Sequence, residues 1–308
     1  MPTAGATHID QYLTNFSRRI SNEGFIAERA CTVVPVRKDS DLFATYSNDH
    51  LRVVEDRRAP GSPPNEVDYE VGSDTYRLVE HTLRDSVPDE ERDNADEPFA
   101  PYEDAVMGLQ ERIRIRLEKE AAGIFFDQNK WSFKETLSGG DQWDDYENSN
   151  PFTVIQDGKS SVLSKALRKP NLIIVGQEVF NALVNHPMIL DRVKYTSRDS
   201  ITPEMLARLF DVETFLVGSA VENASKEGQA DNLTYIWGKH CFIGYRAPRP
   251  SLRTVTAVSL FRSRDFPRVE RYRHPDPGAK ATYVSYGDKW DIRQVADGAG
   301  FLILNAVS

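Results

Sequence analysis

The most regular pattern of hydrophobic and polar positions in the chain lies between residues 170 and 218. An apolar run ends at Gly176, and hydrophobic residues then recur at the three- and four-residue spacing of one helix face. Thr202 and Pro203 are typical of an N-cap followed by the first residue of a helix. A second apolar run closes at Gly218. We predict a compact α/β unit with strands at 171–175 and 212–217 and helical stripes at Val179, Phe180, Leu183, Val184, Ile189, Leu190, Val193, Leu206, Leu209 and Phe210.

The longest helical pattern begins at Pro101. Glu103 and Asp104 follow in the first turn, where the helix dipole favours acidic groups. Hydrophobic residues then alternate with arginines and lysines at helical spacing, at Val106, Leu109, Ile113, Leu117 and Ile124. The pattern predicts an amphipathic helix over residues 101–123 that buries one stripe and is long enough to act as a strut.

The first third of the chain has few hydrophobic residues with which to form a core. Residues 1–35 predict an arm that lies on another surface, because their scattered apolar positions cannot bury one another. Residues 51–55 and 75–80 read as two strands around a Pro- and Gly-rich tip at 57–66, which predicts a long hairpin. Such a hairpin is marginal alone and needs support. The acidic stretch 85–97 is predicted to be an irregular connector.

The remaining segments mix loops and strands. Residues 124–169 combine aromatic residues with Gly, Asp and Asn, which predicts loops followed by a helix at about 160–168. Strands at 233–237 and 240–245 around Gly238 predict a hairpin. Further strands are expected at 281–286, 290–295 and 301–306, with turns at Gly287-Asp288 and Asp297-Gly298. Together with the α/β unit, these elements indicate an α+β fold.

Composition and charge narrow the classes of protein. The chain has 308 residues, of which 40% are hydrophobic and 28% charged, and it contains no run long enough to cross a bilayer. Its two cysteines have no metal-binding spacing. The net charge of −9 lies entirely in the first 100 residues, whereas residues 246–273 hold eight arginines and two acidic residues. The two regions could pair within one chain or between chains, or could be two solvated faces.

The sequence contains few of the patterns that mark catalytic sites. The chain has no G-x-S-x-G, no phosphate-binding glycine loop, no dinucleotide fingerprint and no H-E-x-x-H. Residues 138–141 fit a surface turn better than a phosphate site, and His186 is placed to cap a helix end. His240 and Cys241 are adjacent in a predicted strand, so they point to opposite faces and cannot share a metal. Asp144, Asp145 and Glu147 fit an exposed acidic loop. We predict no catalytic, cofactor-binding or metal-binding residues.

Three segments carry a resemblance to a known family. They read KPNLIIVGQEVFNALVNHPMILDRVKY, ITPEMLARLFDVETFLVGSAVENASKEGQ and WGKHCFIGYRAP. With the order of the parts, they resemble the major capsid proteins of tailed bacteriophages, which have the Hong Kong 97-type fold. The resemblance implies an N-terminal arm at 1–35, an extended E-loop at 36–98, a P domain at 99–169 with its spine helix at 101–123, an A domain at 170–250, and strands at 251–308 that return to the P and A domains.

The same resemblance implies a function and partners. The chain would be a structural protein that self-assembles as hexamers and pentamers into an icosahedral head around double-stranded DNA, present in the virion and made in the host bacterial cytoplasm. A portal at one vertex, a decoration protein and DNA held without sequence-specific binding are implied, with no membrane partner. Some members cross-link subunits through an E-loop lysine, but no lysine lies between Lys38 and Lys119, so we expect non-covalent assembly. Arm and loop use all the residues before the spine helix, so a separate scaffolding protein is expected.

The charge split suggests where subunits meet. We hypothesise that the acidic hairpin of one subunit, or its acidic connector at 85–97, contacts the arginines of another. The residues concerned are Glu55, Asp56, Arg57, Arg58, Glu66, Asp68 and Glu70 on the hairpin, and Arg262, Arg264, Arg268, Arg271 and Arg273 on the arginine strip. Two alternatives remain open: an encapsulin-like nanocompartment shell, and a soluble α/β enzyme with its site near Gly176 or Gly218.

Overall fold

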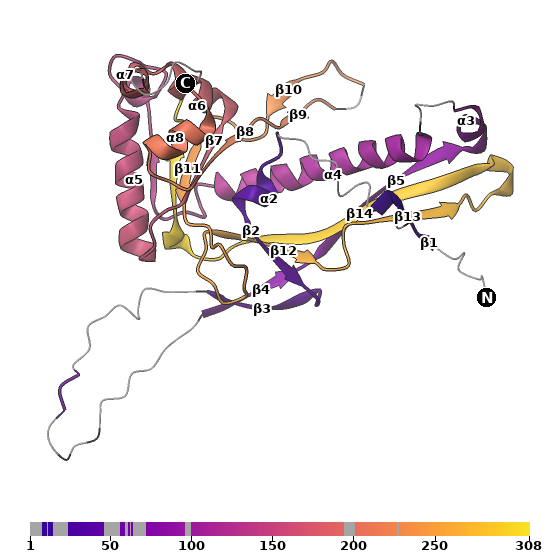
Figure 1. Ribbon diagram of the computed structural model, residues 1–308, viewed down its shortest axis with the longest axis horizontal. Helices are drawn as coiled ribbons and strands as arrows, with labels where there is room; N and C mark the ends of the chain where they lie inside the picture. Colours follow the sequence, from indigo (N-terminus) through magenta and orange to yellow (C-terminus); the bar gives the residue numbers. More distant parts are fainter. Residues whose placement is uncertain are drawn as a thin grey trace.

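The chain folds around two β-sheets of different shape. The computed structural model describes residues 8–10, 12–14, 24–45, 56–58, 61, 63, 72–95, 100–193, 201–226 and 228–308. The first sheet is elongated and has the order β1 (His8–Ile9), β13 (Arg268–Arg273), β14 (Ala281–Gln294), β12 (Val258–Ser263) and β2 (Thr32–Val36), with β5 (Val79–Pro88) along β14. The second sheet has the order β6 (Lys134–Thr136), β15 (Gly300–Leu304), β11 (Cys241–Gly244), β7 (Leu172–Gly176) and β8 (Thr214–Gly218). It lies at one end of the first sheet (Figure 1).

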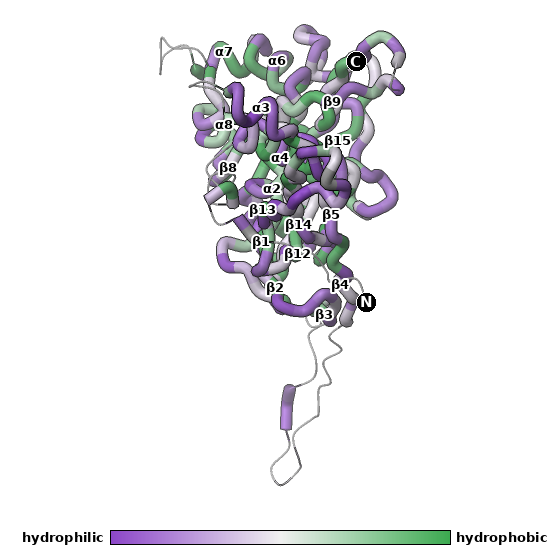
Figure 2. The backbone as a smooth tube through the Cα atoms, turned by 90° about the vertical axis from the view of Figure 1, so that its right-hand side faces the viewer, coloured by the Kyte–Doolittle hydropathy of each residue, from purple (hydrophilic) through white to green (hydrophobic). Residues whose placement is uncertain are grey.

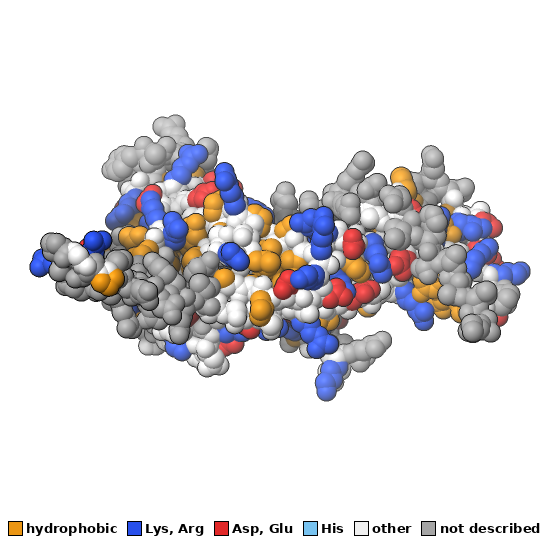
Figure 3. Space-filling model, turned by 90° about the horizontal axis from the view of Figure 1, so that it is seen from below, with side chains coloured by type: hydrophobic (Ala, Val, Ile, Leu, Met, Phe, Trp, Pro, Cys, Tyr) orange, Lys and Arg blue, Asp and Glu red, His pale blue; other side chains and the backbone are white. Residues whose placement is uncertain are grey.

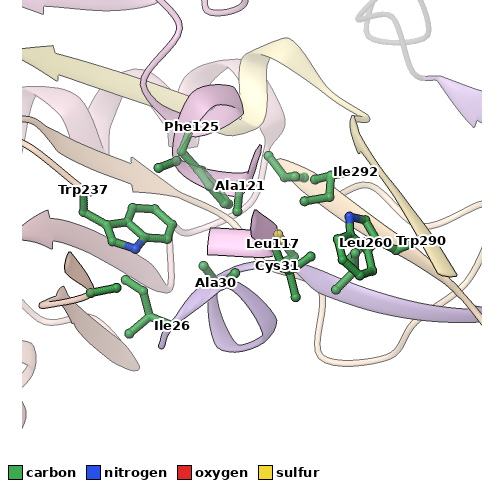
Figure 4. Packing of buried hydrophobic residues seen from close by; sticks show 14 of the residues in the cluster. Ile26, Ala30, Cys31, Leu117, Ala121, Phe125, Trp237, Leu260, Trp290 and Ile292 are labelled. Carbon is green, nitrogen blue, oxygen red and sulfur yellow. The ribbon is translucent and has the colours of Figure 1, made fainter. Parts of the chain in front are cut away.

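The long helix α4 (Pro101–Phe125) covers one face of the elongated sheet. Val106, Leu109, Ile113 and Leu117 of its predicted stripe are buried and Ile124 is half-buried, and the helix runs two residues beyond the expected range 101–123. Its C-terminal half packs between the short helix α2 (Ala27–Ala30) and strands β12 and β14. Figure 4 shows this junction, where Trp237 from the smaller sheet region meets the same core. The core therefore joins the two sheets through α4.

The α/β unit predicted at 170–218 is present nearly as expected. Strands β7 and β8 run parallel, and every residue of β7 is buried. The Thr202 side chain accepts a hydrogen bond from the Met205 backbone N–H, as an N-cap does. The helices around this sheet are α5 (Pro151–Ala166), α6 (Gln177–Asn185), α7 (Pro187–Val193) and α8 (Pro203–Leu209). In Figure 2 the hydrophobic stretches run through the interior of the body, among the strands and α4.

Two strands pair in the region of the predicted hairpin. Strand β4 (Gly72–Arg77) pairs with β3 (Ser40–Thr45). Residues 51–55, the expected first strand, lie outside the described residues. The acidic stretch 85–97 is not an irregular connector. Its first residues belong to β5, which pairs with β14 from Val79 to Pro88, and helix α3 (Asp89–Asn94) follows. Hydrogen bonds to β14 hold this polar sequence in a strand. The solvent-exposed face of β5 needs no hydrophobic residues.

Three other predictions from local pattern were wrong. Residues 233–245 do not form a hairpin, since β11 pairs with β7 and β15 while β10 (Leu233–Tyr235) pairs with β9 (Val221–Asn223). Gly287 and Asp288 are not a turn, because β14 continues through them and both residues pair with β5. Helix α5 begins at Pro151 rather than near residue 160, with the Asn150 side chain accepting from the Thr153 N–H as its cap. The first two predictions failed because these strands pair with residues distant in the sequence. The third failed because the Asn150 cap was not recognised.

None of the helices in the described ranges is both long enough and apolar enough to cross a bilayer.

Candidate intersubunit interface

The strand ends near Gly176 and Gly218, where an enzyme site was considered, are closed. The two glycines are neighbours at the ends of parallel β7 and β8. A Cβ on Gly176 would lie 1.7 Å from the carbonyl oxygen of Gly238, and a Cβ on Gly218 would lie 2.2 Å from Cγ of Trp237. Residues 237 and 238 therefore lie directly against the two glycines and leave no room for a side chain at either position.

The histidines and acidic residues considered for chemistry have structural roles. His186 is buried, with its Nε2 atom 3.1 Å from the Ser149 hydroxyl, and its Nδ1 atom accepts from the Met188 N–H at 3.2 Å. Its side chain therefore caps the start of α7, and its backbone N–H donates to the Leu183 carbonyl in the last turn of α6, so His186 does cap the end of that helix as expected. The Nδ1 atom of His240 accepts from the Asn305 N–H, and a carboxylate oxygen of Asp144 accepts from the Ser308 N–H. No metal-binding group of three such residues occurs in the described part of the chain.

Arg262 of the arginine strip forms ion pairs inside its own chain. Its Nε atom donates to Asp288 Oδ1 at 2.9 Å, a second nitrogen contacts Asp288 Oδ2, and a third donates to Glu28 Oε1 at 2.8 Å. The Asp288 side chain is 4% exposed and the Arg262 side chain 17%. The bidentate geometry matches guanidinium to carboxylate. This group therefore fastens α2, β12 and β14 together.

The other strip arginines that form ion pairs also reach acidic groups of their own chain. Arg268 pairs with Glu270 at 2.8 Å, Arg271 with Asp10 at 3.2 Å, and Arg273 with Asp89 at 2.6 Å. Hydrogen bonding from Arg273 lowers the pKa of the Asp89 carboxyl. Some acidic residues of the first third are thus paired with arginines of residues 246–273 in the same chain.

Arg264 is an exposed residue of the strip. Its Nε atom donates to the Pro35 carbonyl at 3.5 Å. On the hairpin, Asp56, Arg57 and Arg58 are exposed. The remaining predicted contacts, Glu55, Glu66, Asp68 and Glu70, lie outside the described residues. The intersubunit contact stays a prediction.

The sheet face opposite α4 carries a basic and aromatic surface that the pattern did not single out. The Arg84 guanidinium lies 4.5 Å from the centre of the Tyr283 ring, and the Tyr272 ring lies 5.5 Å from that of Tyr283. Figure 3 shows Lys and Arg side chains spread along the underside of the molecule among hydrophobic and acidic groups. The alternation of β5 could have revealed Arg84, had residues 79–88 been recognised as a strand.

Glu118 on α4 forms a second buried junction that sequence reasoning missed. Its carboxylate accepts from the Ala27 backbone N–H and from Trp237 Nε1, each at 2.7 Å, and the residue is 2% exposed. Burial raises the pKa of the Glu118 carboxyl, against the lowering effect of these hydrogen bonds. One carboxylate therefore links the start of α2, the long helix and the smaller sheet region.

Comparison with known proteins identifies the family. No protein-family model matches the chain. It is 30% identical over 257 residues to the major capsid protein of Pseudomonas phage JBD67, across 82% of both chains. It is 29% identical over 240 residues to the major capsid protein of Burkholderia phage BcepMu, across 77% of this chain and 76% of that one. The chain belongs to the major capsid proteins of bacteriophages.

Solved structures agree on the fold of this capsid protein. A phage-related protein from Bordetella bronchiseptica RB50 superposes with a TM-score of 0.78 at 25% identity, over 98% of both chains. The capsid of Cyanophage P-SCSP1u superposes with a TM-score of 0.59 at 9% identity, over 91% of this chain and 87% of that one, which speaks for the fold alone. The expected Hong Kong 97-type α+β fold is confirmed.

The Glu118 junction of the capsid protein predicts a pH dependence. A carboxyl with a raised folded-state pKa contributes stability below its ordinary pKa and loses it as the pH rises through the raised value. We expect the free energy of unfolding of the native chain, relative to Glu118→Gln, to fall as the pH rises from about 4, by about 1.4 kcal/mol per unit of pKa shift. Urea titrations at several pH values measure this difference. A difference that grows with pH would show that the hydrogen bonds outweigh burial.

Proposed function

We propose that this chain is the repeating subunit of an icosahedral phage head, assembled as hexamers and pentamers around double-stranded DNA. The observation that carries the proposal is the 30% identity to a phage major capsid protein over 82% of both chains. The closed strand ends at Gly176 and Gly218 also favour a structural role over a catalytic one. The exposed β3–β4 ribbon, with Leu42 56% exposed, offers surface for a neighbour.

We assign each part of the chain to a domain of the capsid fold and name its partners. Residues 1–35 are the arm, 36–98 the E-loop, 99–169 the P domain, 170–250 the A domain and 251–308 the returning strands. A scaffolding protein assists assembly, a portal occupies one vertex, and DNA is enclosed without sequence-specific contacts; a decoration protein is a further candidate partner. The protein is made in the host bacterial cytoplasm and resides in the virion. Assembly is non-covalent, so the capsid protein runs in denaturing gels of particles as the 34.9 kDa chain, without a ladder of cross-linked multiples.

Size-exclusion chromatography followed by negative-stain microscopy tests the proposal. A shell elutes in the void volume and appears as closed particles, whereas the enzyme alternative elutes as a monomer or small oligomer. The contents of particles from infected cells then separate a phage head from an encapsulin-like shell. Nuclease-protected double-stranded DNA supports the head, and protein cargo without DNA contradicts it.

Complementary charge is the contact we propose between neighbouring subunits. The acidic hairpin residues of one subunit face the outward arginines of the strip on the next, above all Arg264 and Arg273. The Arg273 side chain is 64% exposed despite its pair with Asp89. Arg262 is buried in its own chain and supports the strip from within. Both sides of the contact are partly solvated, so each pair is weak and the effect comes from repetition.

Charge reversal tests this contact. Arg264→Glu, or the triple change Asp56→Lys, Glu66→Lys and Asp68→Lys, is expected to lower the assembled fraction about tenfold, corresponding to about 1.4 kcal/mol per subunit. Combining both sides should restore part of the assembly. The matched control is Arg249→Glu, an exposed arginine outside the strip, which should assemble normally. Full assembly of both one-sided variants would remove the proposed contact.

A further inference from the structure

The described part of the N-terminal arm closes one edge of the elongated sheet. Strand β1 pairs antiparallel with β13, with Ile9 opposite Glu270, and is the last strand on that side of the sheet. In Figure 1, β1 lies beside β13 below the long helix α4. An open strand edge offers N–H and C=O groups to which another chain can add a strand. The arm covers groups of this kind on β13.

The pairing of β1 with β13 ends in a helical turn. The Asp10 N–H donates to the Val269 carbonyl at 3.1 Å, and the Val269 N–H donates to the Thr14 hydroxyl oxygen at 3.0 Å. In a regular antiparallel pair the Asp10 carbonyl would accept from Val269. Here it accepts from the Thr14 N–H instead, at 3.0 Å. A side chain therefore takes the place of a strand at this point of the edge.

An ion pair and a buried side chain hold the same turn in place. One carboxylate oxygen of Asp10 lies 3.2 Å from an Arg271 nitrogen, and the other accepts from the Leu13 N–H at 3.1 Å. The Leu13 side chain is 2% exposed and belongs to the main hydrophobic cluster, which also contains Val269 of β13 and Val106 of α4. The edge of β13 and the first turns of α4 thus form a binding site that residues 8–14 occupy.

We propose that residues 8–14 guard the edge of β13 in their own subunit and prevent other copies from adding a strand there. The segment keeps this position in the assembled shell. Subunits with a guarded edge associate through their other surfaces, whereas open edges would pair from copy to copy and give aggregates in place of closed particles. The inference rests on the proposed function, because it concerns how free subunits reach a closed shell.

Variants of the full chain that loosen the turn test the guard in free subunits. Thr14→Val removes the hydroxyl that accepts from the Val269 N–H, and Leu13→Asp removes the buried anchor. In both variants we expect the Val269 amide hydrogen to exchange with deuterium on the order of tenfold faster, and the amide hydrogens of β7 to be unchanged. The fraction of aggregated chain that binds thioflavin T should rise.

Tyr12→Phe is the matched control for these variants. The Tyr12 side chain is 67% exposed, and the change removes a hydroxyl that donates to Glu103 outside the turn. Its exchange and aggregation should match those of the native chain. Native exchange at Val269 and native aggregation in both Thr14→Val and Leu13→Asp would overturn the guard.

A disulfide lock tests where the segment lies in particles. Ile9→Cys and Glu270→Cys stand opposite each other, within the Cα separation that a disulfide spans, and the native Cys31 and Cys241 are buried. We expect oxidised subunits to assemble as well as reduced ones, and their particles to give monomers in non-reducing denaturing gels. Failure of the locked subunits to assemble, or a ladder of cross-linked copies, would overturn the guard and leave the proposed function standing. Absence of particles from the native chain would overturn the proposed function, and amide exchange in free subunits would still decide on the guard.

Discussion

Asp288→Asn is expected to lower the free energy of unfolding by about 3 to 5 kcal/mol, the range for breaking a buried ion pair by removing one partner. The substitution keeps the shape of the side chain but removes the charge that the Arg262 guanidinium grips with two nitrogens. Glu28 remains as a partner but is 46% exposed, so it compensates only in part. Urea titration of dissociated subunits gives the free energy, provided that unfolding is two-state.

Two controls separate charge from packing at this site. The exposed pair of Lys38 and Asp41 should be insensitive, so Asp41→Asn should leave the urea midpoint nearly unchanged. The double variant Arg262→Met with Asp288→Leu should recover most of the lost stability, since a well-packed apolar pair can replace a buried ion pair. A native-like midpoint for Asp288→Asn would contradict the assigned role of the ion pair.

Gly176→Ala is expected to destabilise the chain by at least about 3 kcal/mol, at the upper end of the usual cost of overpacking. The new Cβ would lie 1.7 Å from the Gly238 carbonyl oxygen and 3.0 Å from the Trp237 oxygen. Both are backbone atoms, so relief requires moving the segment that closes the strand ends and holds Trp237 in the core. Thermal melting and the yield of soluble chain measure the effect.

Glycine-to-alanine substitutions within α4 should instead stabilise the chain. Gly108 and Gly123 lie within α4, and a Cβ at either position meets no atom within 4 Å. Gly108→Ala or Gly123→Ala should therefore stabilise the chain by about 0.5 to 1 kcal/mol through helix propensity. If Gly176→Ala were as stable as these controls, the close approach of residues 237 and 238 would be wrong.

Local signals predicted the elements whose boundaries are set locally. Thr202 and Pro203 marked the start of α8, and Pro101 marked α4, because caps and proline act on their own turn. The pairing of β11 with β7 and β15 joins residues far apart in sequence, so adjacent segments were mistaken for a hairpin. Strand β5 was missed because its exposed residues are polar and its order depends on β14.

The buried charged groups could not be predicted from pattern. Glu118 and Asp288 are residue types that normally face water, and each is buried only because donors from distant segments converge on it. The uneven distribution of charge is visible in the sequence. The sequence does not show that Asp10, Glu28 and Asp89 form ion pairs with strip arginines of their own chain. The function was inferred from the family resemblance, because no single residue of the chain indicates it.

A cryo-electron microscopy reconstruction of particles formed by the full chain tests the central claim most directly. We predict a closed icosahedral shell of hexamers and pentamers, with the A domains, residues 170–250, around each capsomer axis. A small soluble oligomer with no shell under any assembly condition would contradict it.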